Sequence, residues 1–543
     1  MTPVSAEPLD AIIVGAGFSG LYMLHRLRTL GLSARVFEAG SAVGGTWFWN
    51  RYPGARCDIE SLEYSYSFSE DLTREWRWSE RYASQAEILR YLNHVADRFD
   101  LRRNIELNTR VTSAVFDENA GTWTVRTDRL PPTPARFCIM ATGCLSVPKT
   151  PEYPGLETFR GNCYHTSTWP HDPVEFTGQS VGVIGTGSSG IQSIPMIARQ
   201  AARLYVFQRT PSFSVPARNG PLSSATIDDW NANGPAYREK ARNSALGINH
   251  VDPADRSSLA TPDDERRRAY EERWDRGGFS LLGTFNDLLV NPAANETAAD
   301  FVRSKIREIV RDPAVAGKLA PKQYPIGAKR MCVDTDYYAT FNRDNVTLVD
   351  LMETPIQAIT PAGLRTSDRE YALDSIVFAT GFDAMTGALS RIDIRGRGGI
   401  SLKEKWAAGP RTYLGLATAG FPNLFTVTGP GSPSVLSNMV LSIEQHVEWI
   451  AACMASLKRS RIATIEATPE AESAWVEHVN EVANYTIFPL ANSWYVGANV
   501  PGKPRVFMPY IGGVAAYRQK CDEVASGNYA GFALSAACAA GAM

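Results

Sequence analysis

The amino-acid sequence contains the motif G-x-G-x-x-G twice, and each copy directly follows a short apolar run. The first copy occupies residues 15–20 after the run 11–14, and the second occupies 185–190 after the run 181–184. A buried strand, a glycine turn and a following helix form the phosphate-binding unit of a dinucleotide-binding domain. The chain is therefore predicted to be an α/β protein with two Rossmann-like domains, each of which binds one dinucleotide.

The first motif is predicted to hold FAD. Gly15 permits the tight turn, Gly17 lets the backbone approach a pyrophosphate, and Gly20 lets the helix pack closely on the sheet. The next apolar run, 34–37, ends at Glu38, whose carboxylate can accept hydrogen bonds from a ribose diol. The alternative, a glycine turn in an unrelated sheet, leaves Glu38 unexplained.

The second motif is predicted to hold NADP(H). The run that follows it, 204–207, ends in Gln208, Arg209 and Thr210, so the acidic residue is missing and an arginine stands near its place. A guanidinium fits the 2′-phosphate of NADP, whereas a carboxylate would repel it. A surface arginine on a loop is the alternative interpretation. Two nucleotide sites in one chain indicate electron transfer between two cofactors, as in a flavoprotein oxidoreductase.

Composition argues against several other classes of function. The chain has 543 residues, a formal net charge of −2 and no long run of lysine or arginine, which disfavours nucleic acid or a membrane as a partner. The N-terminus lacks the apolar core of a secretory signal, and the eight cysteines form no C-x-x-C. We therefore expect a cytoplasmic protein without a metal site, either a monomer or a weak homo-oligomer. The end from Ala530 to Met543, rich in small side chains, is predicted to be frayed.

Two further segments narrow the chemistry. Residues 159–170 follow the pattern F-x-G-x-x-x-H-x-x-x-W-P, and residues 44–54 form a glycine-containing loop with aromatic walls. In these motifs, and nearly from end to end, the chain resembles the type I Baeyer–Villiger monooxygenases, especially those that act on phenylacetone and steroids. His165, the histidine of the first pattern, is interpreted as a linker residue that coordinates domain motion rather than as a base.

The resemblance implies a reaction. Members of this family use NADPH to reduce FAD, form a C4a-peroxyflavin with O2, and convert a small-molecule ketone into an ester or lactone. It also implies that Arg330 stabilises the peroxide and the negative adduct, that Asp58 pairs with Arg330, and that Lys329 helps Arg209 hold the NADP phosphate. On the residues alone, Lys329 and Arg330 are more simply a solvated basic pair.

The glycine motifs and the resemblance together assign residues to each cofactor. Those expected at FAD are Gly15, Gly17, Ser19, Gly20, Glu38, Thr46, Trp47, Phe48, Trp49, Asp58, Tyr64, Val111 and Met439. Those expected at NADP are Arg56, Gly185, Thr186, Gly187, Ser188, Ser189, Gly190, Gln192, Arg209, Thr210, Lys329, Arg330 and Trp494. Residues 433–436 match the loop at the substrate pocket, and Val435 stands where the phenylacetone enzyme has alanine, so the shape of the pocket does not carry over.

The FAD domain is predicted to be split into residues 1–145 and 382–543. Between the two parts lies the NADP domain, 146–381, with a charged helical insertion at about 219–322. A flavin monooxygenase that oxidises nitrogen or sulfur is an alternative, against which the 159–170 pattern and Arg330 argue. A nucleotide-binding redox sensor without turnover is another, against which Asp58, Arg330 and Trp494 argue.

Overall fold

Two large β-sheets organise the protein, whose computed structural model describes residues 7–251 and 254–536. The first sheet has the strand order β17-β4-β5-β6-β1-β2-β3, and β18 pairs with β6. Its centre is parallel, and β4 and β5 extend it with antiparallel pairings. Its strands are β1 (Leu9–Val14), β2 (Ala34–Phe37), β3 (Ile105–Glu106), β4 (Val111–Asp117), β5 (Thr122–Thr127), β6 (Thr133–Met140), β17 (Asp393–Arg395) and β18 (Leu424–Thr426).

The second sheet is parallel throughout and has the strand order β12-β9-β8-β16-β7. Short, nearly continuous apolar runs suit such strands, because a parallel sheet is covered on both faces. Its strands are β7 (Asn162–His165), β8 (Ser180–Ile184), β9 (Arg203–Gln208), β12 (Val346–Asp350) and β16 (Ser375–Phe378).

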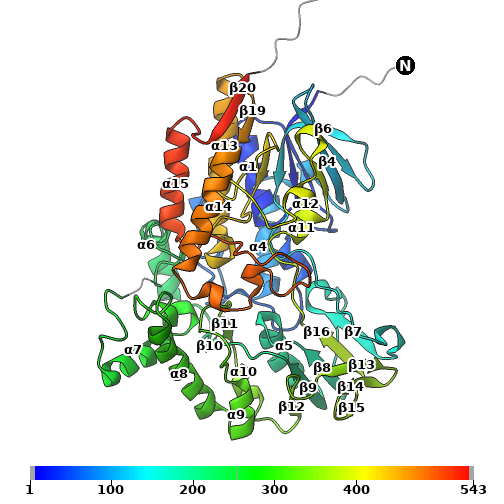
Figure 1. Ribbon diagram of the computed structural model, residues 1–543, viewed down its shortest axis with the longest axis vertical. Coiled ribbons are helices and arrows are strands. Elements are labelled where there is room, and N and C mark those ends of the chain that lie inside the picture. The colour runs from blue at the N-terminus through cyan, green and yellow to red at the C-terminus, as the bar shows by residue number, and fades with distance from the viewer. Residues whose placement is uncertain (1–6, 252–253, 537–543) are drawn as a thin grey trace, which may run out of the picture.

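The chain passes from the first sheet to the second and then returns. Strands β1 to β6 end at Met140, the second sheet occupies residues between 162 and 378, and β17 and β18 rejoin the first sheet. In Figure 1 the first sheet lies in the upper lobe and the second in the lower lobe. The α/β architecture with two dinucleotide-binding units is confirmed by the solved structures that resemble it, while the boundaries at 145 and 381 stay predictions.

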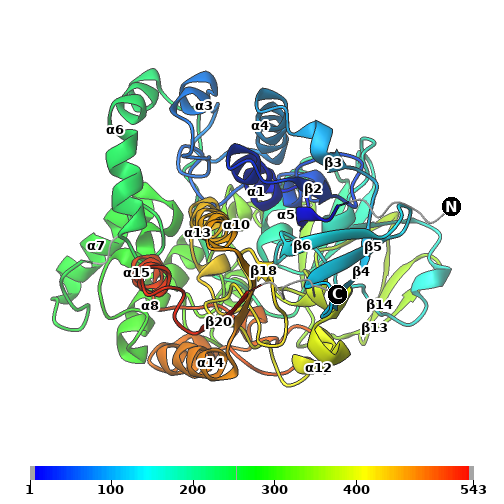
Figure 2. The same cartoon turned by 90° about the horizontal axis from the view of Figure 1, so that it is seen from above.

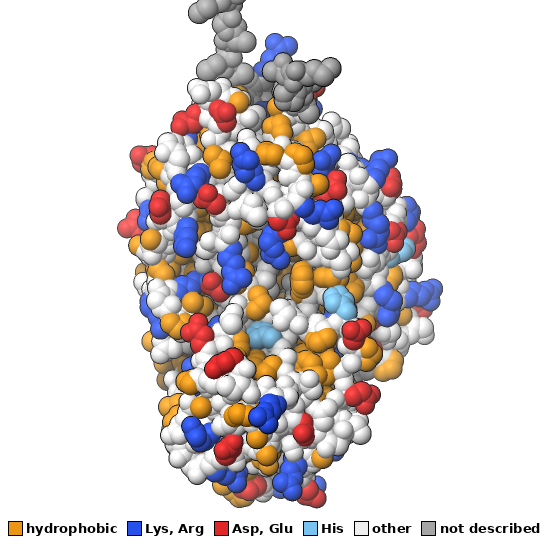
Figure 3. Space-filling view, turned by 90° about the vertical axis from the view of Figure 1, so that its right-hand side faces the viewer, with side chains coloured by type: hydrophobic (Ala, Val, Ile, Leu, Met, Phe, Trp, Pro, Cys, Tyr) orange, Lys and Arg blue, Asp and Glu red, His pale blue; other side chains and the backbone are white. Residues whose placement is uncertain are grey.

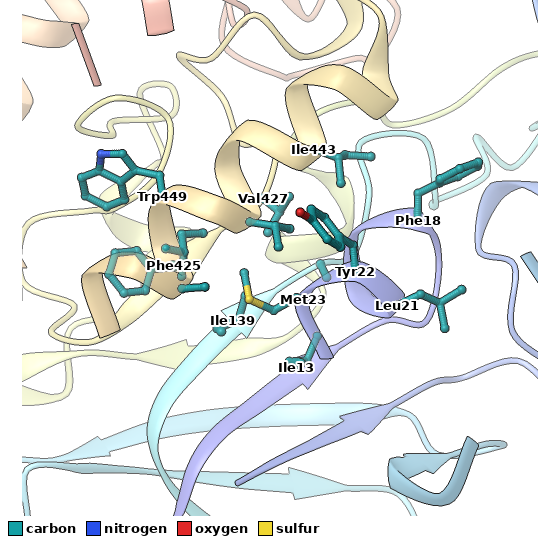
Figure 4. Packing of buried hydrophobic residues seen from close by; sticks show 14 of the residues in the cluster. Ile13, Phe18, Leu21, Tyr22, Met23, Ile139, Phe425, Val427, Ile443 and Trp449 are labelled. Carbon is teal, nitrogen blue, oxygen red and sulfur yellow. The ribbon is translucent and has the colours of Figure 1, made fainter. Parts of the chain in front are cut away.

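The core of the upper lobe forms where helix α1 (Phe18–Thr29) packs against helix α13 (Met439–Arg459) and the first sheet. Figure 4 shows Tyr22 and Met23 of α1 facing Ile443 of α13, with Ile139 of β6 beneath them. The hydroxyl of Tyr22 donates a 3.0 Å hydrogen bond to Glu448, which satisfies the one polar atom of that ring. Segments more than 400 residues apart in sequence therefore share one core.

Most of the helices between β9 and β12 lie on one side of the lower lobe (Figure 1). They are α6 (Ser224–Arg242), α7 (Asp263–Arg276), α8 (Pro292–Ile309) and α9 (Pro313–Leu319). Helix α8 buries Phe301, Val302 and Ile306 against α7 and the second sheet's core, while most charged residues of α7 remain exposed. Seen from above, α6 and α7 lie at the opposite end of the molecule from β4 and β5 (Figure 2).

Further helices and strands complete the fold. The remaining α-helices are α2 (Thr46–Trp49), α3 (Glu70–Glu75), α4 (Gln85–Arg98), α5 (Ser188–Ala198), α10 (Tyr337–Thr340), α11 (Gly387–Ser390), α12 (Leu402–Lys405), α14 (Pro469–Asn484) and α15 (Val514–Ser526). The remaining strands are β10 (Ser214–Pro216), β11 (Cys332–Asp334), β13 (Ile356–Thr360), β14 (Gly363–Thr366), β15 (Glu370–Ala372), β19 (Ile462–Ala467) and β20 (Phe532–Ala536).

The prediction of a frayed end is wrong for residues 532–536. They form β20, which pairs antiparallel with β19, because β19 offers an open edge and Phe532 packs on Trp449 and Tyr413. Tertiary packing thus overrides the weak local preference of a segment rich in small side chains. The rest of that segment, 537–543, lies outside the described residues.

Within the described residues, no helix is both long and apolar enough to cross a lipid bilayer, and no cluster of His, Cys, Asp and Glu is suited to a metal ion. On the face shown in Figure 3, acidic and basic side chains are interspersed. That face therefore offers no field of a single sign to a polyanionic partner.

Gly20→Ala tests the close packing of α1 on β1. A Cβ at Gly20 would lie 1.8 Å from the carbonyl oxygen of Gly15, so we expect the free energy of unfolding to fall by about 1–3 kcal/mol. Retention of FAD should fall with it, measured from the visible absorbance of the purified protein. Gly317→Ala in α9 is the matched control, because a Cβ there meets nothing within 4 Å. A Gly20→Ala protein as stable as that control would contradict the packing argument.

Candidate active site

The first glycine turn has the geometry that a pyrophosphate requires. Gly15 has a φ of +106°, which an L side chain rarely adopts, and it joins β1 to α1. Gly17 is the N-cap of α1 and provides no side-chain cap, so first-turn N–H groups are left for a ligand. A Cβ on Gly17 would approach only Gly45, which leaves room for a phosphate beside the turn.

Glu38 lies at the end of β2 beside this turn and is only 5% exposed. Its carboxylate accepts one hydrogen bond of 2.7 Å from the N–H of Ala16 and another of 2.7 Å from the N–H of Gly40. Burial raises the pKa of Glu38, and the two backbone donors oppose that rise. The carboxylate is thus held rigidly at the position predicted to receive the ribose, with further lone pairs for two hydroxyls.

The aromatic loop forms helix α2 beside the first glycine turn. Trp47 is buried and donates from its Nε1 to the hydroxyl of Tyr64 at 3.3 Å, while Phe48 and Trp49 stack edge to face. Thr46 begins the helix and is exposed. The rings form stiff walls near Gly17, as a flat ring system requires.

The other predicted FAD residues are distributed over helices α1 and α13 and strand β4. Ser19 is buried in α1, and Met439 begins α13 and packs between the cores of the two lobes. Val111 begins β4 on the other face of the first sheet, in a cluster with Ile12 and Phe37. The role of Val111 at FAD stays a prediction.

The second glycine turn repeats the geometry of the first. Gly185 has a φ of +110°, and a Cβ on Gly190 would lie 2.2 Å from the carbonyl oxygen of Gly185. Gly187, the N-cap of α5, faces open space, and Thr186 donates from its Oγ1 to the carbonyl of Thr210 at 3.1 Å. The residues present therefore fit a second dinucleotide phosphate group.

Arg209 and Lys329 lie close enough to affect each other electrostatically. Burial lowers the pKa of Lys329, and the positive charge of Arg209 lowers it further. Lys149, which the sequence analysis did not single out, responds to burial and to Arg209 in the same way. Such a group of cations favours the binding of an anion.

Arg330 and Asp58 form a bidentate ion pair. Nε of Arg330 donates to Oδ2 of Asp58 at 2.8 Å, and Nη2 donates to Oδ1 at 2.7 Å. The third nitrogen, Nη1, donates to the carbonyl of Val435 at 2.7 Å, and the ring of Phe279 lies 5.2 Å from the guanidinium. Three bonded nitrogens leave the guanidinium little freedom to rotate.

The charge of Arg330 is permanent. Burial by itself lowers the pKa of Arg330, but the attraction of Asp58 outweighs burial and raises the pKa overall. Tyr495 lies beside Arg330, and burial raises the pKa of Tyr495 to about 12, so its hydroxyl is neutral at working pH. Tyr495 was not predicted, although its position next to Trp494 in the sequence was an available signal.

Gln192 connects helix α5 to the segment that follows helix α2. The hydroxyl of Tyr52, after the aromatic loop, donates to Oε1 of Gln192 at 2.8 Å, and Nε2 of Gln192 donates to the carbonyl of Arg56 at 3.1 Å. The guanidinium of Arg56 is itself paired with Glu80. Arg56 therefore supports the contact between the lobes in this structure, and its predicted contact with NADP stays a prediction.

The segment that carries Trp494 is fastened to the end of the second sheet. The ring of Trp494 lies 4.4 Å from that of Tyr495, in the 3₁₀ helix 494–496. Nζ of Lys503 donates to Asp383 at 2.6 Å, and Nδ2 of Asn499 donates to the carbonyl of Phe382 at 2.7 Å. The segment thus lies over residues that follow β16.

His165 ends β7 and connects to the same region. Its Nε2 lies 3.0 Å from Oγ1 of Thr380, and its Nδ1 lies 2.6 Å from Oγ of Ser167. Burial lowers the pKa of His165, which favours the neutral ring. Ser167 of the linker binds one ring nitrogen, and Thr380, which follows β16, binds the other. The ring therefore has a structural role, as expected for a linker residue.

Comparisons with known proteins identify the family. The chain is 43% identical over 532 residues to a Baeyer–Villiger monooxygenase from Pseudooceanicola batsensis, a match that covers 97% of this chain and 96% of that protein. This protein is a Baeyer–Villiger monooxygenase. The structure of an oxidised steroid monooxygenase bound to NADP matches with a TM-score of 0.94 and 55% identity, and it covers 97% of this chain and 99% of that one.

Two further matches complete the comparison. A phenazine N-monooxygenase from Lysobacter antibioticus is 44% identical over 529 residues, covering 97% of each chain. The family model for pyridine nucleotide-disulphide oxidoreductases matches residues 12–231, which include both glycine motifs. As a Baeyer–Villiger monooxygenase, the protein is an FAD-dependent enzyme that consumes NADPH and oxygenates ketones to esters or lactones.

Asp58→Ala tests the ion pair at the centre of this Baeyer–Villiger monooxygenase. The Asp58 and Arg330 side chains are 21% and 25% exposed, so removal of the carboxylate leaves a largely buried cation without its partner. We expect the free energy of unfolding to fall by about 3 kcal/mol, measured by urea denaturation. Glu70→Ala, which removes an exposed pair with Arg74, should change it by less than about 0.5 kcal/mol. Equal effects of the two substitutions would contradict the pairing argument.

Proposed function

We propose that Arg330 is the catalytic residue of this monooxygenase and that Asp58 is its positioning residue. The observation that carries the proposal is the bidentate pair with Asp58, which fixes a permanent positive charge where the two lobes meet. A fixed cation stabilises negative charge that develops on a reacting oxygen, and it does so without reorganisation during the reaction. Arginine suits this task because it never loses its proton in practice.

The flavin, when bound, accepts hydride from NADPH and supplies the chemistry that activates oxygen. The protein's own residues bind and orient the cofactors and shield the site from water. Glu38 and the turn at Gly15 hold one dinucleotide, and the buried ring of Trp47 and the half-buried ring of Tyr64 exclude water from one wall of the site. Tyr495 keeps a neutral hydroxyl beside Arg330, so it adds no negative charge that would oppose the guanidinium.

The NADP phosphate is proposed to bind at Arg209 and Lys329, beside the turn at Gly187. The support is the exposed guanidinium of Arg209, the electrostatic proximity of Lys329, and the open space over Gly187. Together they provide two cations and free N–H groups where a 2′-phosphate and a pyrophosphate are expected.

The proposed substrate is a bulky ketone, either an aryl ketone or a steroid. The support is the 55% identity to a steroid monooxygenase over almost the whole chain. The pocket loop also carries a small 3₁₀ turn, 434–436, whose Val435 carbonyl binds Arg330, so the loop adjoins the proposed catalytic group. The branched side chain of Val435 occupies more of this region than alanine does.

A ketone panel tests the function. The purified holoenzyme is given NADPH, oxygen and either phenylacetone, cyclohexanone or progesterone, and products are identified by mass. We expect an ester or lactone one oxygen heavier, formed faster from phenylacetone or progesterone than from cyclohexanone. Arg330→Ala should lower ester formation by a factor of about 100 or more while NADPH still bleaches the flavin. Ester formation at the wild-type rate in that variant would remove Arg330 from the proposed role.

Arg209→Ala tests the phosphate site. Removal of the guanidinium should raise the KM for NADPH by about tenfold and leave the KM for NADH nearly unchanged, because only NADPH carries the 2′-phosphate. The measurement is initial-rate kinetics with each nucleotide at a saturating ketone concentration. Arg203→Ala is the control and should change neither constant, because Arg203 begins β9 and Arg209 directly follows the other end of that strand. An equal rise for both nucleotides in Arg209→Ala would refute the assignment.

Oxygenation of an aromatic nitrogen is a second candidate activity. It is favoured by the 44% identity to a phenazine N-monooxygenase. Incubation with a phenazine carboxylic acid and NADPH separates the two, since an N-oxide keeps the carbon skeleton and an ester does not. An N-oxide in the absence of any ester from the ketone panel would make N-oxygenation the main activity.

A cytoplasmic location and a monomeric or weakly associating state also belong to the proposal. The support for a reducing compartment is that the cysteines at 57, 138, 144, 163, 332, 453 and 521 are free thiols. Sedimentation of the holoenzyme would determine its oligomeric state.

A further inference from the structure

Three residues other than glycine adopt left-handed backbone conformations around the pocket loop. Leu414 has a φ of +57°, Thr428 a φ of +54° and Ser434 a φ of +42°. Such values are unusual for any residue with a Cβ, and for β-branched threonine they are genuine outliers. A strained backbone of this kind persists only where the surroundings hold it.

A chain of buried hydrogen bonds joins these three residues. The N–H of Thr428 donates to Nδ1 of His446 at 2.9 Å, and Nε2 of His446 lies 2.8 Å from the hydroxyl of Tyr517. That hydroxyl donates to the carbonyl of Leu414 at 2.5 Å. Ser434 donates from its Oγ to the carbonyl of Thr428 at 3.1 Å. Helix α13, which carries His446, and helix α15, which carries Tyr517, thereby hold the loop from behind.

The geometry determines where each proton lies. Nδ1 of His446 accepts from a backbone N–H, so Nε2 carries the ring proton and donates to the Tyr517 oxygen, whose own proton goes to Leu414. His446 is completely buried, and burial lowers its pKa to about 3, so the ring stays neutral and keeps this one tautomer. Both ring nitrogens of His446 and the hydroxyl of Tyr517 therefore have hydrogen-bond partners.

The same loop supplies a contact to Arg330. Ser434 precedes Val435, whose carbonyl accepts the 2.7 Å hydrogen bond from Nη1 of Arg330. The position of that carbonyl depends on the backbone of Ser434, and Ser434 is tied to Thr428 and so to His446. Asp58 holds two nitrogens of Arg330 from the side of the first lobe, and the loop holds the third.

We propose that His446 and Tyr517 are positioning residues that lock the strained pocket loop and, through the Val435 carbonyl, orient Arg330. General packing alone would not require hydrogen bonds at the strained residues. Here one nitrogen of the neutral His446 ring binds the N–H of Thr428, and the other connects through Tyr517 to Leu414. Neither residue touches a reacting atom, so each acts through the loop. The inference rests on the proposed role of Arg330.

Tyr517→Phe is the mildest test, because it removes one oxygen and keeps the ring in the core. We expect NADPH consumption to continue while the ester formed per NADPH consumed falls by about 3- to 10-fold, because the hydroxyl's hydrogen bonds with His446 and Leu414 are both lost, with hydrogen peroxide accounting for the difference. His446→Asn keeps an acceptor for the Thr428 N–H, whereas His446→Leu keeps none. The ester yield per NADPH should therefore fall less in His446→Asn than in His446→Leu. Unchanged ester yield per NADPH in Tyr517→Phe would overturn the proposal.

Tyr270→Phe is the matched control, since it removes a 2.7 Å hydrogen bond to Thr297 from a buried tyrosine in the helical insertion. It should lower thermal stability about as much as Tyr517→Phe without changing the ester yield per NADPH. If both variants lower that yield equally, Tyr517 contributes stability only and the proposal fails.

Thr428→Gly separates the lock from general destabilisation. Glycine adopts a positive φ without strain, so this substitution removes the need for the lock. We expect it to restore much of the ester yield when combined with Tyr517→Phe, and a double variant no better than Tyr517→Phe alone would refute the strain argument. Arg330→Ala is measured beside these variants. If ester formation survives Arg330→Ala, the proposed catalytic role of Arg330 is wrong. A lower ester yield in Tyr517→Phe would in that case show that Tyr517 positions the pocket loop but does not act through Arg330.

Discussion

The ion pair between Arg330 and Asp58 joins parts of the chain that lie 272 residues apart in sequence. Asp58 follows the aromatic loop of the first lobe, and Arg330 precedes β11 beside the second sheet. Because both nitrogens of one guanidinium edge are bound to one carboxylate, the two lobes meet with a defined geometry at this point. The site depends on that geometry, since each lobe holds one dinucleotide and the reaction requires the two cofactors to meet.

The two glycine turns share one backbone geometry, although the residues beside them suit different dinucleotides. In both, a glycine with positive φ ends a strand, and a second glycine lets a helix pack on the turn. The difference lies at the end of the next strand, where Glu38 is buried and fixed by backbone donors and Arg209 is exposed. A buried carboxylate suits a neutral diol, and an exposed guanidinium suits a phosphate.

Much of this site was predictable because it rests on local rules. Glycine turns require particular residues at particular spacings. The residue type at the end of the following strand indicates which dinucleotide the site prefers. The frayed end was mispredicted because residues 532–536 form a strand only where the edge of β19 is available. Lys149 was not predicted, since no local pattern relates it to Arg209, and Tyr495 was missed although it directly follows Trp494 in the sequence.

The sequence by itself determined the two strand–turn–helix units and, through its resemblance to a family, the pairing of Asp58 with Arg330, while the cofactor that each unit prefers stays a prediction. Tertiary structure alone decided how the pocket loop is held. His446 lies in a helix and Tyr517 in another, and nothing in either stretch of sequence indicates that their side chains meet behind Thr428. The physical reason is that a hydrogen bond between distant segments depends on the packing of whole helices, which local spacing does not encode.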